Sequence, residues 1–465
     1  MASAIGVAIG KTRMETDAAD ARTADVRTAG TINGDGALLR RIGFWALAAS
    51  VINNTIGGGI FALPGTLAKS MGAAAPLAFV LGAVVFIPIA LCFSAAGSRV
   101  HATGGPYSYV TAAFGEFPGF VIAAVLWISN VAADGGIAAA LADQAQHVSA
   151  VFANPLARNA LIVAVFTVLC VLNARGVRIG AHAVMAFATM KLVPLIPLAT
   201  LGLLYIHPVN LHIAAMPGST AVGSSMVAVI FAYAGMETAL MPSGEVSDPS
   251  RVVPRATMTA IALVVLIYIG LQVVAQGVLG NALAGNTAPL AATAGAIAPL
   301  LFSVFLLVAI VSQFGFLQND LLGSSRLLYA LGRDGYLPSP LARITTNNRV
   351  PLIAVVTHAV AACTLGVVGD FGHLVMLSGG AVCMAYVACC AAAWRLQRRD
   401  QHGEGKPFRL PGGALIPVIG CAGLVLVLST LQKEEWLAIG YALLALVVIY
   451  AIVRLLRGSK GLPTA

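Results

Sequence analysis

Residues 53–61 read Asn-Asn-Thr-Ile-Gly-Gly-Gly-Ile-Phe and interrupt the first long apolar segment of the chain. Three consecutive glycines weaken a helix, because glycine gains the most backbone entropy on unwinding and adds no side-chain packing. At bilayer depth, unpaired backbone groups persist only where protein covers them or where they line a wet cavity. The stretch therefore predicts a broken membrane helix with a binding site at the midplane, which is typical of secondary transporters.

The composition around this stretch indicates a polytopic membrane protein. Hydrophobic residues make up 59% of the chain and charged residues only 10%, and the mean hydropathy is +0.90. Apolar segments of about 20 residues predict an all-α integral membrane protein with twelve transmembrane helices, the eighth of which is expected to run on into the cytoplasm. The predicted helices are 41–69, 74–97, 118–147, 158–173, 180–206, 222–245, 255–280, 297–331, 351–368, 373–396, 412–431 and 435–456.

The distribution of positive charge predicts the orientation. Most of the 27 Lys and Arg residues fall in the tails and the even-numbered loops, whereas Lys69, Arg158 and Lys433 lie on the opposite side and Lys191 lies within a span. Positive loops stay in the cytoplasm, so both termini are predicted to be cytoplasmic. The high alanine content favours a bacterial inner membrane. The sequence has no basic stripe interleaved with aromatic residues, the pattern that would indicate nucleic-acid binding. Membrane lipid is expected to surround the protein. The sequence does not predict an oligomeric state.

Polar segments mark the expected domain boundaries. Residues 1–39 are expected to be a disordered cytoplasmic tail and not a cleaved signal, because they lack an apolar core with a small-residue cleavage site. A transport core with helices one to ten is expected at 40–396, the last two helices at 397–458, and a second cytoplasmic tail at 459–465. The loops are too short for a nucleotide-binding domain, and no G-x-x-x-x-G-K-[ST] motif occurs. Energy would therefore come from a gradient or from exchange.

The cysteines give no sign of a cofactor. All seven fall inside predicted helices, without the spacing of zinc ligands or a disulfide framework. They are interpreted as small packing residues, and neither a metal nor a cofactor is expected.

The sixth predicted span repeats the pattern of the first. Residues 229–238 place Gly235 in mid-span and Glu237 directly after it, and Pro242 and Gly244 weaken the end of the helix. Two interrupted helices five spans apart predict two five-helix repeats of inverted topology, broken at helices one and six and followed by two C-terminal helices.

Four segments together resemble the amino acid–polyamine–organocation superfamily of permeases, which have the LeuT-type fold. They are the glycine break at 57–61, the segment 231–237, the loop 245–255, which resembles the family's E-E-V-x-N-P-x-R-x-I-P-R pattern, and the end of the eighth helix at 325–338. The resemblance spans nearly the whole membrane body. Many relatives carry Ser where this chain has Gly58, so a hydroxyl near the substrate is absent here.

The two breaks offer groups that suit an amino-acid zwitterion. Free N–H groups and the positive dipole end at Gly57, Gly58 and Gly59 suit a carboxylate. Carbonyls released at Ile56 in the first helix, and at Phe231 and Ala234 beside Gly235 in the sixth, would suit an ammonium group. The resemblance implies that Phe231 is an aromatic gate over the substrate. The alternatives are glycines that only permit close helix packing and a Phe that only fills the core.

Lys191 and Glu237 are the candidates for proton coupling. Glu237 is a carboxylate at bilayer depth, where an ionisable group is usually functional, and it could carry a proton or face a cationic substrate. The resemblance implies that a lysine on helix five replaces the cation that joins helices one and eight in sodium-coupled relatives. Lys191 could then hold the carbonyls of the first half-helix, with Ser324 and Ser325 as candidate neighbours on helix eight. A structural acid and a lysine that reaches the interface are the alternatives.

Further polar residues could line the pathway. Asn130 and Asp134 share one face of helix three, and Asn130 ends a Trp-Ile-Ser-Asn pattern similar to one in the arginine–agmatine exchanger of the superfamily, where the Asn faces substrate. Asp320 is a candidate on helix eight. His358 lies well inside a span and is interpreted as a packing or hydrogen-bonded residue.

The function that these patterns predict is secondary active transport of a small amino acid by alternating access, proton-coupled or exchanging. A cationic amino acid or polyamine antiporter that uses Glu237, Asp134 and Asp320 is the alternative. An integral-membrane enzyme would belong to a different class, but neither H-E-x-x-H nor G-x-S-x-G is present, so no enzymatic activity is expected. A channel is a weaker option, because no selectivity-filter ring is readable.

Overall fold

The structure is a computed structural model that describes residues 42–101, 104–175, 181–241, 246–345, 350–401, 403 and 405–456. The tails expected at 1–39 and 459–465, and Pro242 and Gly244, lie outside this part. Within it no strand forms, and a single parallel bridge joins Ile42 to Val246. The α-helices are α2 (Phe44–Thr55), α3 (Leu63–Met71), α4 (Ala75–Gly97), α5 (Pro106–Phe114), α6 (Glu116–Ala145), α7 (Pro155–Ala174), α8 (Ala181–Leu201), α9 (Ser219–Tyr233), α10 (Met236–Ala239), α11 (Pro249–Leu279), α12 (Pro289–Ile297), α13 (Pro299–Arg333), α14 (Leu352–Val368), α15 (Phe371–Arg398), α16 (Leu415–Leu428) and α17 (Lys433–Leu456).

The apolar helices make the chain an integral membrane protein. Nine helical segments of the described residues are long and apolar enough to cross a bilayer, and the shorter apolar helices α14 and α16 accompany them. Helix α13 has 35 residues, which agrees with the expectation of an overlong eighth span. The apolar segments do not predict the nine-residue helices α5 and α12. Each begins with a proline, Pro106 or Pro289, which suits the first turn of a helix.

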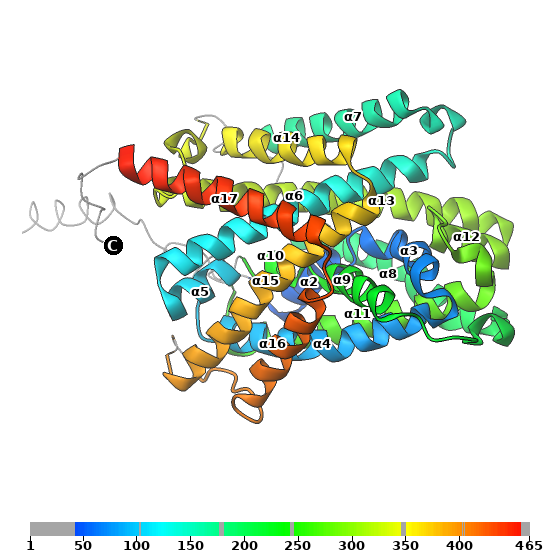
Figure 1. Cartoon of the computed structure of the whole chain (residues 1–465), viewed down its shortest axis with the longest axis horizontal. Coiled ribbons are helices and arrows are strands. Elements are labelled where there is room, and N and C mark those ends of the chain that lie inside the picture. Colours follow the sequence, from blue (N-terminus) through cyan, green and yellow to red (C-terminus); the bar gives the residue numbers. More distant parts are fainter. Residues whose placement is uncertain are drawn as a thin grey trace, which may run out of the picture.

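The first apolar segment is divided as its glycines predict. Helix α2 ends at Thr55, residues 56–58 are not helical, and a short 3₁₀ turn, η2 (Gly59–Phe61), leads into α3. Figure 1 shows α2 and α3 as separate blue helices near the middle of the molecule.

The sixth segment is divided as well. Helix α9 ends at Tyr233, Ala234 is extended, and Gly235 has a φ of +120°, which strains any other residue. A Cβ on Gly235 would lie 2.7 Å from the carbonyl carbon of Asn54. The two interrupted helices therefore meet backbone to backbone, and only glycine permits that approach.

Helix α6 forms the centre of the bundle. In its apolar part 89% of the residues are buried, against 22% for α7 and 17% for α17. It packs against α13, α14 and α15, and α7 lies beside α14 at one edge of the molecule (Figure 1). The exposed apolar faces of α7 and α17 are those expected of helices that contact lipid.

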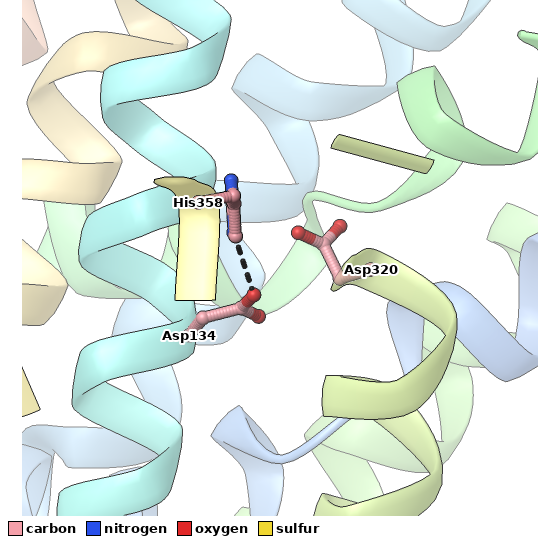
Figure 2. A group of neighbouring side chains, drawn as sticks. All are labelled: Asp134, Asp320 and His358. Atoms are coloured by element: carbon pink, nitrogen blue, oxygen red, sulfur yellow. Dashed lines mark hydrogen bonds and ion pairs between the residues drawn. The ribbon is translucent and has the colours of Figure 1, made fainter. Parts of the chain in front are cut away.

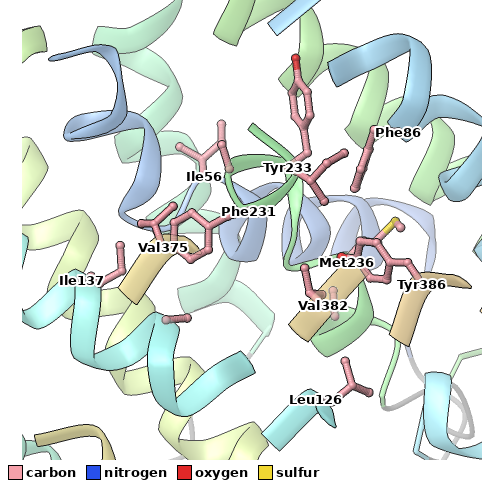
Figure 3. Packing of buried hydrophobic residues seen from close by; sticks show 14 of the residues in the cluster. Ile56, Phe86, Leu126, Ile137, Phe231, Tyr233, Met236, Val375, Val382 and Tyr386 are labelled. Atoms are coloured by element: carbon pink, nitrogen blue, oxygen red, sulfur yellow. The ribbon is translucent and has the colours of Figure 1, made fainter. Parts of the chain in front are cut away.

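Aromatic side chains pack against the end of α9, next to the sixth-helix break. The rings of Tyr233 and Tyr268 stack with centroids 5.7 Å apart, and Phe86 lies 5.3 Å from Tyr233 and 6.0 Å from Tyr386. Figure 3 shows Phe86, Tyr233 and Tyr386 on one side of the break and Phe231 on the other. The hydroxyl of Tyr268 donates to the carbonyl of Thr55 over 2.8 Å, so this layer also holds the end of α2.

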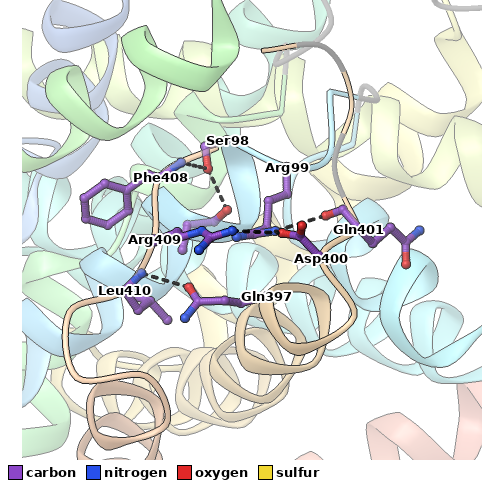
Figure 4. Close-up of polar contacts among 9 residues, drawn as sticks. Ser98, Arg99, Gln397, Asp400, Gln401, Phe408, Arg409 and Leu410 are labelled. Carbon is purple, nitrogen blue, oxygen red and sulfur yellow. Dashed lines mark hydrogen bonds and ion pairs between the residues drawn. The ribbon is translucent and has the colours of Figure 1, made fainter. Parts of the chain in front are cut away.

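Polar contacts attach the segment after α15 to the end of α4. Arg99 donates to the carbonyl of Gln401, and both Arg99 and Arg409 lie 3.6 Å from Asp400. Ser98 accepts a hydrogen bond from the backbone of Phe408 over 3.0 Å. Figure 4 shows Arg409, Arg99 and Asp400 in one row, with Ser98 and Phe408 beside it. They fix the connection that leads to α16.

Candidate functional site

A cavity opens where the two interrupted helices meet. It is bounded by the breaks of the first and sixth segments and by α6, α13 and α15. The lining residues are Asn54, Thr55, Gly57, Gly58, Gly59, Ser129, Asn130, Ala133, Ile137, Phe231, Ala232, Ala234, Gly235, Glu237, Thr238, Phe316, Asp320 and Ser378.

Backbone donors face this cavity at the first break. Within the described residues, the N–H groups of Gly57, Gly58 and Gly59 have no acceptor in the protein. These groups precede α3, where the helix dipole favours an anion. The break therefore offers the donors that a carboxylate needs.

Neighbouring side chains use the space that these glycines leave. A Cβ on Gly57 would lie 2.3 Å from the ring of Phe316, and a Cβ on Gly58 would lie 2.5 Å from the side chain of Ile137. Ile137 thus occupies the space that a side chain at position 58 would need. The close approach of both side chains explains why residues 57 and 58 are glycine.

Lys191 holds the carbonyl end of α2. It is fully buried, and its Nζ donates to the carbonyl of Asn53 over 3.2 Å and to that of Ile56 over 3.0 Å. Ser312 on α13 donates to the carbonyls of Ile56 and Gly57, over 3.4 and 2.7 Å. The carbonyl of Ile56, expected to receive a substrate ammonium group, already accepts these two donors.

Glu237 is a polar anchor at the sixth-helix break. Its carboxylate accepts a hydrogen bond from the N–H of Gly235 over 2.9 Å and one from the hydroxyl of Tyr386 over 2.6 Å. The side chain is buried and also borders the cavity. Glu237 therefore links the break to α15 and remains within reach of a bound solute.

The aromatic side chain of Phe231 forms the wall between the two breaks. Its ring lies 6.5 Å from that of Phe371 at the start of α15, and a Cβ on Gly59 would lie 3.1 Å from the Phe231 ring. Figure 3 shows the ring beside Ile137 and Val375. Phe231 and Ile137 thus give the cavity an apolar part of its wall.

A chain of hydrogen bonds runs from the cavity into α13. Asn130 donates to the hydroxyl of Ser324 over 2.7 Å, and Ser324 donates to the carboxylate of Asp320 over 2.8 Å. Behind Asp320, Nε2 of His358 lies 2.9 Å from a carboxylate oxygen of Asp134. Figure 2 shows the three ionisable side chains converging. The sequence predicts no metal, yet these three residues offer ligand-type atoms within 4.8 Å of one another.

The sequence profile of the family described as amino acid permease matches residues 42–453. The chain belongs to the amino acid permease family. This match confirms the resemblance that four separate segments indicate.

Several relatives of this permease are similar over most of their length. The branched-chain amino acid permease of Lactococcus lactis subsp. cremoris is 26% identical over 434 residues, which are 88% of this chain and 92% of the relative. The serine/threonine exchanger of Bacillus subtilis is 26% identical over 431 residues, 88% and 95% of the two chains. The methylthioribose transporter of the same organism is 25% identical over 421 residues, 86% and 90% of the two chains. These relatives are transporters and not enzymes.

The permease structure gathers most of the predicted site residues around the cavity and places others behind it. The predicted residues that line it are Gly57, Gly58, Gly59, Asn130, Phe231, Ala234, Gly235, Glu237 and Asp320. Among the described residues, those that do not line it are Ile56, Asp134, Lys191, Ser324 and Ser325. The carbonyl of Ile56 accepts hydrogen bonds from both Lys191 and Ser312. The α13 hydroxyl at this position is therefore that of Ser312 and not that of Ser324 or Ser325.

Sequence reasoning missed several contacts in this permease. Ser312 follows an apolar run and precedes Gln313, and this polar pair inside a membrane helix was the available signal. Ser129 lies within the Trp-Ile-Ser-Asn pattern, and its hydroxyl donates to the carbonyl of Ser378 over 3.0 Å. Nothing in the sequence near Tyr386 marks it as the partner of a carboxylate.

Proposed function

We propose that this permease moves a small amino acid across a bacterial cytoplasmic (inner) membrane by alternating access, either coupled to protons or in exchange for a second solute. One observation carries the proposal: two interrupted helices meet at a cavity lined by the glycine N–H groups of the first break. An amino-acid carboxylate would bind those N–H groups, and its ammonium group would bind carbonyls at Phe231 and Ala234. Lys191 and Glu237 are the proposed proton-coupling groups.

The topology that we propose is that of the LeuT type. It has twelve transmembrane helices with both termini cytoplasmic, and two inverted five-helix repeats form the transport core at 40–396. The family assignment supports this arrangement, as do the breaks in the first and sixth apolar segments. The last two helices, within 397–458, lie outside the repeats in this proposal.

The walls of the cavity favour a small side chain. Phe231, Ile137 and Phe316 line it together with Ala133, and these residues suit an aliphatic or hydroxyl-bearing group more than a long one. Two relatives, a branched-chain amino acid permease and a serine/threonine exchanger, support the same class of substrate.

A cationic amino acid or polyamine antiporter is the second candidate. The observation that favours it is the pair of carboxylates, Glu237 and Asp320, at the edge of the cavity. A cationic group of a substrate could contact either of them, since a positive partner stabilises an ionised carboxylate that is buried in the protein.

Uptake of a labelled panel into proteoliposomes tests the proposal. The panel contains leucine, alanine, serine, arginine and putrescine, with and without a pH gradient and with and without unlabelled solute inside. Uptake of leucine, alanine or serine that responds to the gradient or to internal solute is expected. Selective uptake of arginine or putrescine would establish the second candidate instead, and no carrier-mediated uptake of any of them would contradict both.

A further inference from the structure

Asp134, Asp320 and His358 form a buried cluster behind the substrate cavity. They come from three different helices, α6, α13 and α14 (Figure 2). Their exposed fractions are 0%, 5% and 0%. Ligand-type atoms of the three residues lie within 4.8 Å of one another, so the cluster acts electrostatically as one unit.

The cluster carries an excess of acid. Within the described residues, its only ion pair is the one between His358 and Asp134, and Lys and Arg side chains do not pair with it. Glu237 on α10 lines the same cavity as Asp320 and adds a third carboxylate near the cluster. Two carboxylates this close inside a bilayer cannot both stay charged without compensation. A protonated His358 balances one of them, and the other needs a further positive charge.

Hydrogen-bond geometry indicates that protons supply this charge. His358 Nε2 and Asp134 Oδ2 are 2.9 Å apart, a distance that one shared proton fills. Two ligands of a tetrahedral zinc ion, each about 2.1 Å from the metal, would lie about 3.4 Å apart. In addition, Asp134 Oδ1 and His358 Nδ1 are buried and have no hydrogen-bond partner among the described residues. These two unpaired atoms leave positions where a proton can be held.

Asp320 connects the cluster to the cavity. It lines the cavity on one side and faces the Asp134–His358 pair on the other. Ser324 donates to its carboxylate, and Asn130, which also lines the cavity, donates to Ser324. A solute with an ammonium group would stabilise the ionised form of Asp320, and the displaced proton would have the Asp134–His358 pair as its nearest acceptor.

We infer that Asp134, Asp320 and His358 form a proton-binding site that exchanges protons with the substrate cavity through Asp320. This site is separate from Lys191, which is bonded to the backbone of α2. The exchange with the cavity rests on the proposed function, whereas the binding of a proton does not.

Infrared spectroscopy of the purified full-length permease tests the binding of the proton without a known substrate. An ordinary Asp is ionised at pH 7, since its pKa is about 3.9, so a carboxylic-acid C=O band that persists at this pH reports a buried protonated acid. The experiment uses a Glu237→Gln background, which removes the nearby third carboxylate. The band is expected to be lost in Asp134→Asn or Asp320→Asn, and to remain in Thr257→Val, which removes a buried hydroxyl on α11 that has no partner in the described part.

Thermal unfolding verifies that each variant is folded. If Asp134→Asn does not fold, the infrared test uses Asp320→Asn alone. A band that is unchanged in both Asp variants overturns the inference. So does one equivalent of a divalent metal per chain in elemental analysis, because a metal would then supply the positive charge.

A second experiment tests the route through Asp320. Once the panel has given a substrate, counterflow of that substrate is measured across a range of pH. Asp320→Asn is expected to flatten the pH dependence of wild type, and an unchanged profile overturns the route through Asp320.

Discussion

The Nζ atom of Lys191 lies 3.0 Å from the carbonyl oxygen of Ile56, the residue directly before the three glycines. The carbonyl end of a helix carries partial negative charge, so a buried ammonium group is stabilised there. The same ammonium also binds the carbonyl of Asn53. One side chain of α8 thereby bonds to the end of α2 directly beside the break, and the proposed coupling role of Lys191 rests on this contact.

Replacing Lys191 by alanine is expected to abolish solute accumulation driven by a gradient. The carbonyls of Asn53 and Ile56 would lose a charged donor, and the break would no longer respond to protonation at this position. Uptake into proteoliposomes, with the amount of inserted protein measured in parallel, checks this outcome. Lys69→Ala is the matched control, because Lys69 is exposed in the last turn of α3. Concentrative uptake by Lys191→Ala at the wild-type level would rule out the coupling role.

Replacing Gly235 by alanine is expected to destabilise the fold by about 1–3 kcal/mol, the usual range for a strained backbone conformation. The new methyl group would also meet the carbonyl of Asn54 at 2.7 Å. Thermal unfolding in detergent measures the effect. Gly440→Ala on α17 is the control, since a Cβ there meets no atom within 4 Å, and it should not lower the midpoint. Equal midpoints for the two variants would show that the contact with Asn54 tolerates a side chain.

A leucine at Gly57 is expected to weaken substrate binding about tenfold or more, which corresponds to about 1.4 kcal/mol. Its side chain would displace Phe316 and cover the N–H groups of the first break. Equilibrium binding of the substrate found in the panel measures the change. Gly315→Ala on α13 serves as the control, because its Cβ would make ordinary contact with Phe187 at 3.9 Å. Wild-type affinity in Gly57→Leu would remove the argument for a carboxylate site.

Tyr386→Phe is expected to lower stability, because it deletes one of the two donors to the carboxylate of Glu237. A hydrogen bond contributes about 0.5–1.5 kcal/mol when Glu237 is protonated and about 1.5–3 kcal/mol when it is ionised. Thermal unfolding again provides the measurement, and Tyr441→Phe provides the comparison, since Tyr441 is 67% exposed on α17. Should both variants unfold at the same temperature, the bond to Glu237 contributes little to stability.

The elements that the sequence predicts well are those with local signals. Runs of apolar residues predict the long helices, and the glycines at 57–59 and at 235 predict where two of them are interrupted. The sequence does not predict the short helices α5 and α12, because nine residues are too few for a hydrophobic period to identify a helix. A proline begins each of them.

The contacts of the site depend on pairs that are distant in the sequence. Asp134 and His358 are 224 positions apart, and Glu237 and Tyr386 are 149 apart. No local period or motif joins such residues, because their proximity follows from how the helices pack and not from the character of either segment. The sequence therefore indicates only a packing or hydrogen-bonded role for His358, and the structure identifies Asp134 as its partner.

The contact between Gly235 and Asn54 has a mechanical consequence. There is no room for even a methyl group between the two backbone segments. A rotation of either half-helix must therefore displace the other. The two hinges would then turn together, and motion that admits a solute from one face would be transmitted to the opposite face. A carrier built in this way would avoid a state that leaks, because neither hinge can relax alone.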